Sequence, residues 1–398
     1  MSLFSGIEQA PADPILGLTE AYNADTRPEK VNLGVGVYLD ESGKIPLLEC
    51  VRKAEQALAA DPKPRGYLPI DGMPAYNAAV KELVFGAGSQ VLAEGRVVTA
   101  QALGGTGGLR IGAGLLSLID PSAQVLVSDP SWENHKALFA RAGFEVGTYR
   151  YYDAATRSVD VDGMVADLEA AAPGTVVVLH ARCHNPTGYE LQPADWDRVV
   201  EVVKAKRLTP FLDMAYQGFA EGITEDAYVV SKLLDAGLTF LLATSFSKSF
   251  SLYGERVGGF SAVCADAAEA KRVQSQVKVL IRTLYSNPPT HGAAIVTHVL
   301  GDPALRAQWE SELGAMRDRI KAMRTGLVDG LKAAGVTQDM SFITDQVGMF
   351  SYSGLTKEQM VRLREEFGVY GTDTGRLCVA ALNTGNLAYV SESIAKVI

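Results

Sequence analysis

Short apolar runs alternate with helical patterns through the middle of this 398-residue chain, and this alternation constrains the fold most strongly. Helical spacing is visible between the runs, for example over Asp195–Ala205 and Asp226–Ala236. Buried parallel strands have nearly continuous apolar sequences and are joined by helices. The sequence therefore predicts an α/β fold with a mostly parallel sheet between helices. The four runs of strand length are Gln124–Val127, Thr175–Leu179, Pro210–Leu212 and Phe240–Thr244.

The C-terminal part of the chain has a different pattern. Six apolar residues recur there at spacings of three or four, which predicts one long amphipathic helix. A shorter strand–helix–strand pattern follows it, over Met349–Tyr352, Thr356–Phe367 and Leu377–Ala381. We place a domain boundary near Leu313, and Asn32–Tyr38 could join the C-terminal part. The six residues are Leu313, Met316, Ile320, Met323, Leu327 and Leu331.

Composition excludes several classes of protein. With 37 basic and 46 acidic residues the net charge is −9, and without a basic tract we expect neither a nucleic-acid partner nor binding to a membrane surface. The apolar runs are too short to span a membrane. The four cysteines are scattered without CxxC spacing, so we expect no disulfide framework, no metal site and a cytoplasmic location. They are Cys50, Cys183, Cys264 and Cys378.

Polar side chains follow all four apolar runs. The carboxyl ends of parallel strands meet at one edge of a sheet, where open α/β folds bind ligands. Taken singly, each residue has an ordinary structural explanation, such as a core aromatic, a turn or a solvated loop lysine. Taken together, they indicate one composed site. The set comprises Trp132, His135, His180, Asn185, Asp213, Tyr216, Ser245 and Lys248.

This set suits an aldehyde cofactor that contains a pyridine ring. A lysine at a buried strand end, here Lys248, can form a Schiff base with the aldehyde. The ring nitrogen needs a carboxylate to keep it protonated, which Asp213 can supply. Tyr216 and Asn185 can serve a phenolic oxygen as hydrogen-bond partners.

A glycine run, Gly104–Gly108, precedes a helical pattern and can supply an anion cradle for the phosphate of such a cofactor. Backbone N–H groups at a helix N-terminus bind phosphate through aligned dipoles. Arg256 and Ser245 could add a charged and a hydroxyl contact. The run does not fit the dinucleotide fingerprint, because its GxGxxG frame ends at Arg110.

Eight motifs occur in an order and spacing that resemble one family. The chain resembles the class I, fold-type I aminotransferases that use pyridoxal phosphate, and within them the aspartate and aromatic amino acid aminotransferases of bacteria. The resemblance runs from Asp13 to Ala380. The motifs are Asn32–Tyr38, Tyr67–Gly72, Gly104–Gly107, Ser128–Trp132, His184–Gly188, Asp213–Phe219, Ser245–Phe250 and Tyr285–Gly292.

The resemblance implies a domain arrangement and a partner. It implies a large cofactor-binding domain over residues 46–312, and a small, mobile domain over 13–45 and 313–398. It also implies an N-terminal arm, 1–12, that reaches across a homodimer. In that dimer, Tyr67 and Arg282 would act on the site of the partner subunit. Cis peptides at Asp129-Pro130 and Asn185-Pro186 are implied as well.

The resemblance also implies the roles of individual residues. Lys248 would carry the cofactor and move a proton, Asp213 would pair with the ring nitrogen, and Tyr216 would complete the catalytic group. His135 and His180 would support Asp213. The cofactor contacts would be Gly105, Thr106, Trp132, Asn185, Asp213, Tyr216, Ser245, Lys248, Arg256 and Tyr67. The substrate contacts would be Gly36, Trp132, Asn185, Arg282 and Arg376.

The implied reaction moves the amino group of tyrosine, phenylalanine and aspartate to 2-oxoglutarate by a ping-pong mechanism. Leu39 and Ile45 lie where aspartate-preferring relatives tend to have a lysine and a threonine, which favours aromatic substrates. Asn287 matches the aspartate-preferring pattern, and Gly66 matches neither. A strict aspartate aminotransferase is therefore the alternative, with Leu39 and Ile45 simply packed against each other on a strand.

Two further alternatives have less support. Decarboxylation or β-elimination on the same cofactor is disfavoured, because Arg376 and Arg282 would retain the substrate carboxylates in ion pairs. A regulator built on this fold would carry a DNA-binding domain, and no basic helix-turn-helix segment precedes Asp13.

Overall fold

A seven-stranded sheet forms the centre of the computed structural model, which describes residues 2–10 and 14–398. The strand order is β2-β10-β9-β8-β7-β3-β4, with β10 antiparallel to both neighbours and every other pairing parallel. The prediction of a mostly parallel sheet is confirmed. The strands are β2 (Val97–Leu103), β3 (Gln124–Asp129), β4 (Glu145–Arg150), β7 (Val176–His180), β8 (Thr209–Met214), β9 (Phe240–Ser245) and β10 (Val257–Val263).

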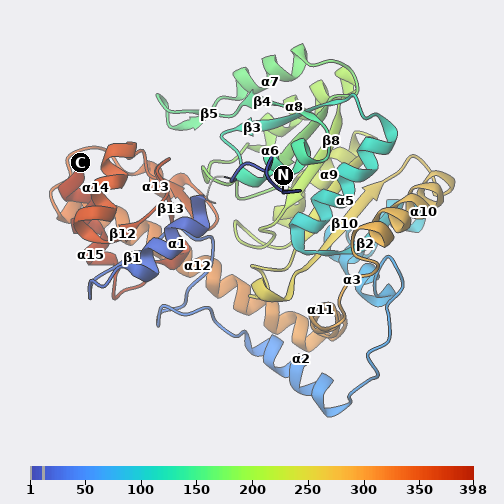
Figure 1. Ribbon diagram of the computed structural model, residues 1–398, viewed down its shortest axis with the longest axis horizontal. Coiled ribbons are helices and arrows are strands. Elements are labelled where there is room, and N and C mark those ends of the chain that lie inside the picture. Colours follow the sequence, from blue (N-terminus) through green and yellow to red (C-terminus); the bar gives the residue numbers. More distant parts are fainter. Residues whose placement is uncertain (1, 11–13) are drawn as a thin grey trace.

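Both faces of this sheet are buried. In β3, Val125 and Val127 pack into one hydrophobic cluster, whereas Leu126 packs into a second cluster on the other face. This burial explains why the strand sequences are continuously apolar rather than alternating. The surrounding helices are α5 (Gly104–Ile119), α6 (Glu133–Arg141), α7 (Val161–Ala170), α8 (Pro193–Lys206), α9 (Tyr228–Asp235) and α10 (Ala267–Leu284) (Figure 1).

A long helix, α12 (Pro303–Ala333), runs from the sheet-bearing body toward the C-terminal elements (Figure 1). Asp302 starts it, because its carboxylate accepts hydrogen bonds from the N–H groups of Ala304 and Leu305. The six apolar residues of the predicted stripe are all buried, so the amphipathic helix is confirmed. Helices α2 (Glu49–Ala60) and α11 (His291–Gly301) pack against α12, α3 (Pro74–Phe85) packs against α11, and α4 (Gln90–Ala93) packs against α3.

Most of the remaining elements gather beside the end of α12, whereas β5 (Tyr152–Asp153) lies at the sheet-bearing body (Figure 1). Strand β1 (Val31–Asn32) pairs in parallel with β12 (Val369–Tyr370), so an N-terminal segment lies against the C-terminal part. Helix α12 continues through Leu313, and the domain limits stay a prediction. The other elements are α1 (Pro14–Ala24), β5 (Tyr152–Asp153), β6 (Ser158–Val159), η1 (Glu225–Ala227), η2 (Tyr253–Glu255), α13 (Phe342–Asp345), β11 (Phe350–Tyr352), α14 (Lys357–Phe367), β13 (Arg376–Cys378), η3 (Val379–Ala381) and α15 (Leu387–Val397).

Several smaller predictions can be compared with the structure. The two cis peptides, at Asp129-Pro130 and Asn185-Pro186, are confirmed. The four cysteines are free and buried. None of the helices within the described ranges is long and apolar enough to cross a membrane. Of the predicted arm 1–12, residues 1, 11 and 12 lie outside the described residues, as does Asp13.

Candidate active site

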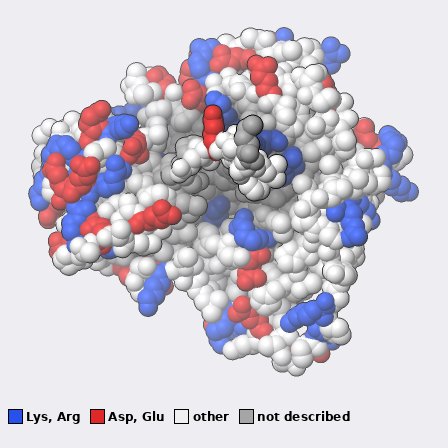
Figure 2. All heavy atoms as spheres, in the orientation of Figure 1, with Lys and Arg blue, Asp and Glu red and all other residues white. Residues whose placement is uncertain are grey.

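A cavity of about 320 Å³ opens at the carboxyl ends of β7, β8 and β9. Figure 2 shows that one face of the molecule is hollowed between the C-terminal elements and the sheet-bearing body. Most of the residues predicted for the site come together in this one cavity. Those that line it are Gly36, Gly105, Thr106, Trp132, His180, Asn185, Asp213, Tyr216, Ser245, Lys248, Arg256 and Arg376.

Lys248 lies just beyond the end of β9, largely buried, with its Nζ atom 4.7 Å from the centre of the Tyr216 ring. Burial lowers the pKa of Lys248 to about 8, against the opposing effect of the Asp213 carboxylate. Near neutral pH a useful fraction of this lysine is therefore an uncharged amine. An amine in that state can attack an aldehyde or accept a proton.

Asp213 lies near the end of β8 and is 5% exposed. His135 donates a hydrogen bond from Nε2 to Oδ2 of Asp213 at 2.8 Å, and His135 Nδ1 lies 3.0 Å from the Ser131 hydroxyl. Burial acts to raise the pKa of Asp213, but the bond from His135 and the nearby charges outweigh it, so the pKa lies below its usual range. The carboxylate is thus held ionised, as a pyridinium partner must be.

His180, at the end of β7, faces the same cavity. Its ring lies 5.0 Å from that of His135 and 4.3 Å from that of His184, measured between centroids. Burial lowers the pKa of His180 to about 3, so the ring is neutral. Within the described chain both of its ring nitrogens lack a hydrogen-bond partner. Buried polar atoms of this kind are uncommon, and they point to a group that belongs in the cavity.

Tyr216 and Asn185 present their polar atoms in the loops that follow β8 and β7. Burial raises the pKa of Tyr216 well above its usual range, so its phenol keeps its proton and can donate it in a hydrogen bond. Asn185 is 5% exposed, and its Oδ1 accepts a bond from Arg376 at 3.1 Å. Trp132, at the start of α6, packs edge-on against the ring of His135.

The N-terminus of α5 forms a small cradle beside Arg256. A Cβ atom on Gly104, whose φ is +68°, would lie 2.6 Å from the Arg256 guanidinium. A Cβ atom on Gly105 would lie 3.3 Å from the Ser245 side chain. The backbone can therefore approach a ligand only because glycines stand here. N–H groups, a guanidinium and the hydroxyls of Ser245 and Ser247 together fit a phosphate.

Arg376, on β13, is 2% exposed and presents a cation to the other side of the cavity. It donates to the Gly34 carbonyl at 2.8 Å, and its Cζ atom lies 4.4 Å from the centre of the Phe350 ring. A Cβ atom on Gly36 would lie 2.7 Å from that ring. A guanidinium fixed in this way matches a carboxylate in two-point geometry.

Two predicted site residues lie elsewhere. Tyr67 is 96% exposed and does not line the cavity. Arg282, on α10, is exposed as well, and its guanidinium donates a hydrogen bond to the Ser286 hydroxyl. Within the single chain, the structure does not bring these two residues to the predicted site.

The residues thought to favour aromatic substrates also lie outside the cavity wall. Leu39 is partly buried against the core, whereas Ile45 is 47% exposed. Neither lies in a strand, so the explanation that they pair on a strand is wrong.

Five residues that line the cavity were given no role from the sequence: Ile15, Ala215, Ser247, Tyr253 and Phe350. Ser247 had a signal, since its hydroxyl follows the same strand end as Ser245. Tyr253 comes from η2, and its hydroxyl accepts a hydrogen bond from the Tyr38 N–H at 2.9 Å. Phe350 follows the typical pattern of a core aromatic and is 3% exposed.

Comparison with known proteins agrees with this site. The family model described as aminotransferase class I and II matches residues 28–394. An aspartate aminotransferase from Pseudomonas aeruginosa is 58% identical, with both chains covered in full. An aromatic-amino-acid aminotransferase from Escherichia coli is 48% identical over 99% of this chain and all of that one. The chain belongs to the class I and II aminotransferase family.

Solved structures agree closely with the whole fold. The aromatic-amino-acid aminotransferase from Burkholderia pseudomallei, covalently bound to pyridoxal phosphate, has a TM-score of 0.98 at 63% identity, with full coverage of both chains. An aromatic amino acid aminotransferase from Psychrobacter, cocrystallised with aspartic acid, has a TM-score of 0.97 at 46% identity and 99% coverage of each chain. The chain is therefore an aminotransferase with the α/β architecture of fold-type I.

Proposed function

We propose that this chain is a pyridoxal phosphate-dependent aminotransferase that moves the amino group of tyrosine, phenylalanine and aspartate to 2-oxoglutarate in a ping-pong cycle. One observation carries the proposal: a lysine with a lowered pKa and an ionised carboxylate face one cavity, beside a cradle that fits a phosphate. The names of the relatives, which include aromatic, tyrosine and aspartate aminotransferases, support it.

The residues present fit pyridoxal phosphate. The glycine-lined cradle and Arg256 would hold the phosphate, Asp213 would hold the ring nitrogen, and Tyr216 and Asn185 would hold the phenolic oxygen. Trp132 lines the cavity and would cover a face of the ring. When bound, the cofactor withdraws the electrons left on the substrate Cα atom after its proton is removed.

The protein's own groups then have distinct tasks. Lys248, once free as an amine, would take the proton from the substrate Cα atom and deliver it to atom C4′ of the cofactor. Asp213 keeps the ring nitrogen protonated through its negative charge. Arg376 binds the substrate α-carboxylate, and because it is already held by Asn185 and Gly34, little ordering is needed on binding.

The breadth of substrates depends on the second arginine. 2-Oxoglutarate and aspartate have a distal carboxylate that Arg282 can pair, whereas an aromatic ring leaves that charge without a partner. By the family resemblance, Leu39 and Ile45 stand where aspartate-preferring relatives tend to have a lysine and a threonine, and they would favour an aromatic donor although neither lines the cavity of the single chain. The alternative, a strict aspartate aminotransferase, is favoured by the name of the 58% identical relative and by Asn287, whose amide donates to the Leu68 carbonyl.

A homodimer would complete the site. Tyr67 and Arg282 project from the surface, where a partner's cavity could receive them. The described part of the N-terminal arm exposes Leu3, Phe4 and Ile7 at 88%, 67% and 72%, which suits packing on a partner.

We also propose a small domain over residues 13–45 and 313–398, supported by the pairing of β1 with β12. A cytoplasmic location fits the four free cysteines.

The first test is the variant Lys248→Ala. We expect it to lose the visible absorbance of the bound cofactor and to lower turnover at least about 1,000-fold, because both the covalent attachment and the Cα base are removed. Lys321→Ala, which changes an exposed lysine on α12, is the control and should match the parent enzyme. Unchanged turnover in Lys248→Ala would refute the proposed site.

The second test concerns the donor. The values of kcat/KM for phenylalanine and aspartate, measured with 2-oxoglutarate, should lie within about tenfold of each other, a difference of about 1.4 kcal/mol in the barrier. A much larger preference for aspartate would support the strict aspartate aminotransferase instead.

A further inference from the structure

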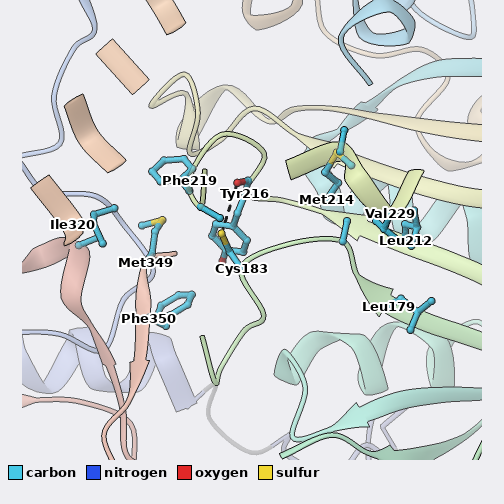
Figure 3. Close-up of a cluster of buried hydrophobic side chains, with 14 of the residues drawn as sticks. Leu179, Cys183, Leu212, Met214, Tyr216, Phe219, Val229, Ile320, Met349 and Phe350 are labelled. Atoms are coloured by element: carbon cyan, nitrogen blue, oxygen red, sulfur yellow. Dashed lines mark hydrogen bonds between the residues drawn. The ribbon is translucent and has the colours of Figure 1, made fainter. Parts of the chain in front are cut away.

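Two loops bring the residues proposed for the cofactor's phenolic oxygen into the cavity. The β7 loop (residues 181–188) carries Asn185, and the β8 loop (residues 215–222) carries Tyr216. Figure 3 shows Cys183 of the first loop beside Tyr216 of the second, where the thiol donates to the Tyr216 carbonyl at 4.0 Å. The position of one loop is therefore coupled to that of the other.

The backbone of the β7 loop is strained at this contact. Cys183 has a φ of +56°, a left-handed conformation that residues other than glycine seldom adopt. Such a conformation persists only where the surrounding structure holds it, and it is found most often at functional sites. Something near Cys183 must therefore hold the loop in place.

Two buried carboxylates hold the backbones of these loops. Asp226, in η1, is 1% exposed and accepts bonds from the N–H groups of Gly218 at 2.8 Å and Ala220 at 3.0 Å. Glu190, just after the β7 loop, accepts a bond from the His184 N–H at 2.9 Å. Each carboxylate thus holds one loop: Glu190 binds the residue just before Asn185, and Asp226 binds the backbone from two residues beyond Tyr216.

Arg182 joins the two carboxylates. Its guanidinium lies 3.5 Å from Glu190 and 3.5 Å from Asp226, and it also donates a hydrogen bond to Glu221. The two 3.5 Å contacts are charge pairs rather than well-formed hydrogen bonds. The Arg182 side chain is only 17% exposed, so water screens these pairs weakly.

Without this cation, the two buried carboxylates would lose the counter-charge that they share. Burial raises the pKa of Glu190 to about 7, with Arg182 opposing the rise and Asp226 adding to it. A buried charge that loses its partner is strongly destabilising. Loss of the arginine would therefore loosen one or both loops.

We propose that Arg182 is a positioning residue: by bridging Glu190 and Asp226 it sets the distance between the β7 and β8 loops, and with it the placement of Asn185 and Tyr216 around the cofactor. The inference rests on the proposed function, because it assigns these two side chains to the cofactor. Arg182 itself does not line the cavity. It acts through the loops, and it need not touch the cofactor or the substrate.

The test is a double-mutant cycle read by release of pyridoxal phosphate. We expect Arg182→Gln to release the cofactor about tenfold faster than the parent enzyme, because both loops relax. In a background that carries both Tyr216→Phe and Asn185→Ala, which lacks both proposed contacts to the phenolic oxygen, we expect the same substitution to change release by less than about twofold. Arg198→Gln, which removes an exposed arginine paired with Asp162, is the matched control and should leave release unchanged.

Every outcome of the cycle bears on the proposal. An equal factor in both backgrounds would show a general structural role, and unchanged release in Arg182→Gln would show no role; either result overturns the proposal. If Arg182→Gln does not fold, Glu190→Gln replaces it in the same cycle, since the amide keeps an acceptor for the His184 N–H and removes only the charge. The proposed function itself is tested separately, because Lys248 is intact in all of these variants.

Discussion

The two parts of the proposed site differ in how far one chain completes them. The part around Lys248 and Asp213 is buried, and the Asp213 carboxylate has a defined partner in His135. The part that a partner subunit would supply consists of Tyr67, for the cofactor, and Arg282, for a distal substrate carboxylate, both exposed and both outside the cavity. One chain therefore supplies the lysine and the carboxylate proposed for the reaction, whereas the proposed contacts of Tyr67 and Arg282 would need a second copy.

This contrast follows from what each part has to do. A lysine with a lowered pKa and an ionised carboxylate need a dry, rigid environment, which the ends of buried strands provide. A substrate must enter and leave, and a group from a neighbouring subunit can contact it without blocking that path. The comparison gives three predictions, from the largest expected effect to the smallest.

The first prediction tests whether Lys248 is a buried amine with a lowered pKa. The pKa of Lys248 falls from 10.5 to about 8 on folding, so the unfolded chain binds this proton more tightly than the folded protein does. Below pH 8, where Lys248 is charged in both states, burying that charge lowers the stability of the folded protein. As the pH rises from 8 to 10.5, that penalty is lost. We expect the cofactor-free Lys248→Met variant to be more stable than the parent by up to about 3 kcal/mol at pH 7, and by about 1 kcal/mol at pH 10.

Urea unfolding of the two cofactor-free proteins, at one protein concentration and at both pH values, measures this difference. Lys321→Met changes an exposed lysine and should show no such pH dependence. If the stability difference between Lys248→Met and the parent were the same at pH 7 and pH 10, Lys248 would not be the buried, uncharged amine that the mechanism needs.

The second prediction tests the proposed role of the exposed residue Arg282. Arg282→Ala should lower kcat/KM for aspartate about 100-fold, which corresponds to about 2.7 kcal/mol, because the distal carboxylate loses its partner. For phenylalanine we expect a change of less than about threefold. Arg272→Ala, on the exposed side of the same helix, should leave both substrates unaffected. Equal losses for the two substrates would remove Arg282 from the site.

The sequence pattern predicted the buried part of the site better than the exposed part. Asp213, Asn185 and Lys248 could be found because polar residues follow apolar strands, and the ends of parallel strands must converge. Phe350 could not be found, since a buried aromatic at the end of a distant strand has the pattern of ordinary core. Arg282 came from family resemblance alone, because no pattern within one chain can show a contact with another.

The fold divides in a comparable way. Apolar runs predicted four strands of the central sheet, β3, β7, β8 and β9, but not β2, β4 or β10. Periodicity predicted the long helix α12, whose burial pattern matches its sequence. The pairing of β1 with β12 joins residues more than 300 positions apart, and two-residue strands carry no periodic signal. Leu39 and Ile45 lie in irregular backbone, which has no repeating spacing of side chains. The sequence pattern therefore could not show where these two side chains point.

The third prediction concerns the border between the two parts, where Glu133 lies 3.8 Å from Arg376. The Glu133 carboxylate partly neutralises the guanidinium that would bind the substrate α-carboxylate, so an incoming substrate must compete with it. Because Glu133 is 42% exposed, water screens the pair and the effect is small. We expect Glu133→Gln to lower KM for aspartate and for phenylalanine alike by about threefold, with kcat changed by less than about twofold.

The two substrates separate this effect from that of Arg282. Every amino acid substrate has an α-carboxylate, so a role at Arg376 must change KM for both, whereas a role at the distal carboxylate changes only that for aspartate. Added salt should reduce the difference between Glu133→Gln and the parent, since it screens an exposed pair further. A rise in KM for both substrates would mean instead that Glu133 holds Arg376 in its binding position, and the competition would be refuted.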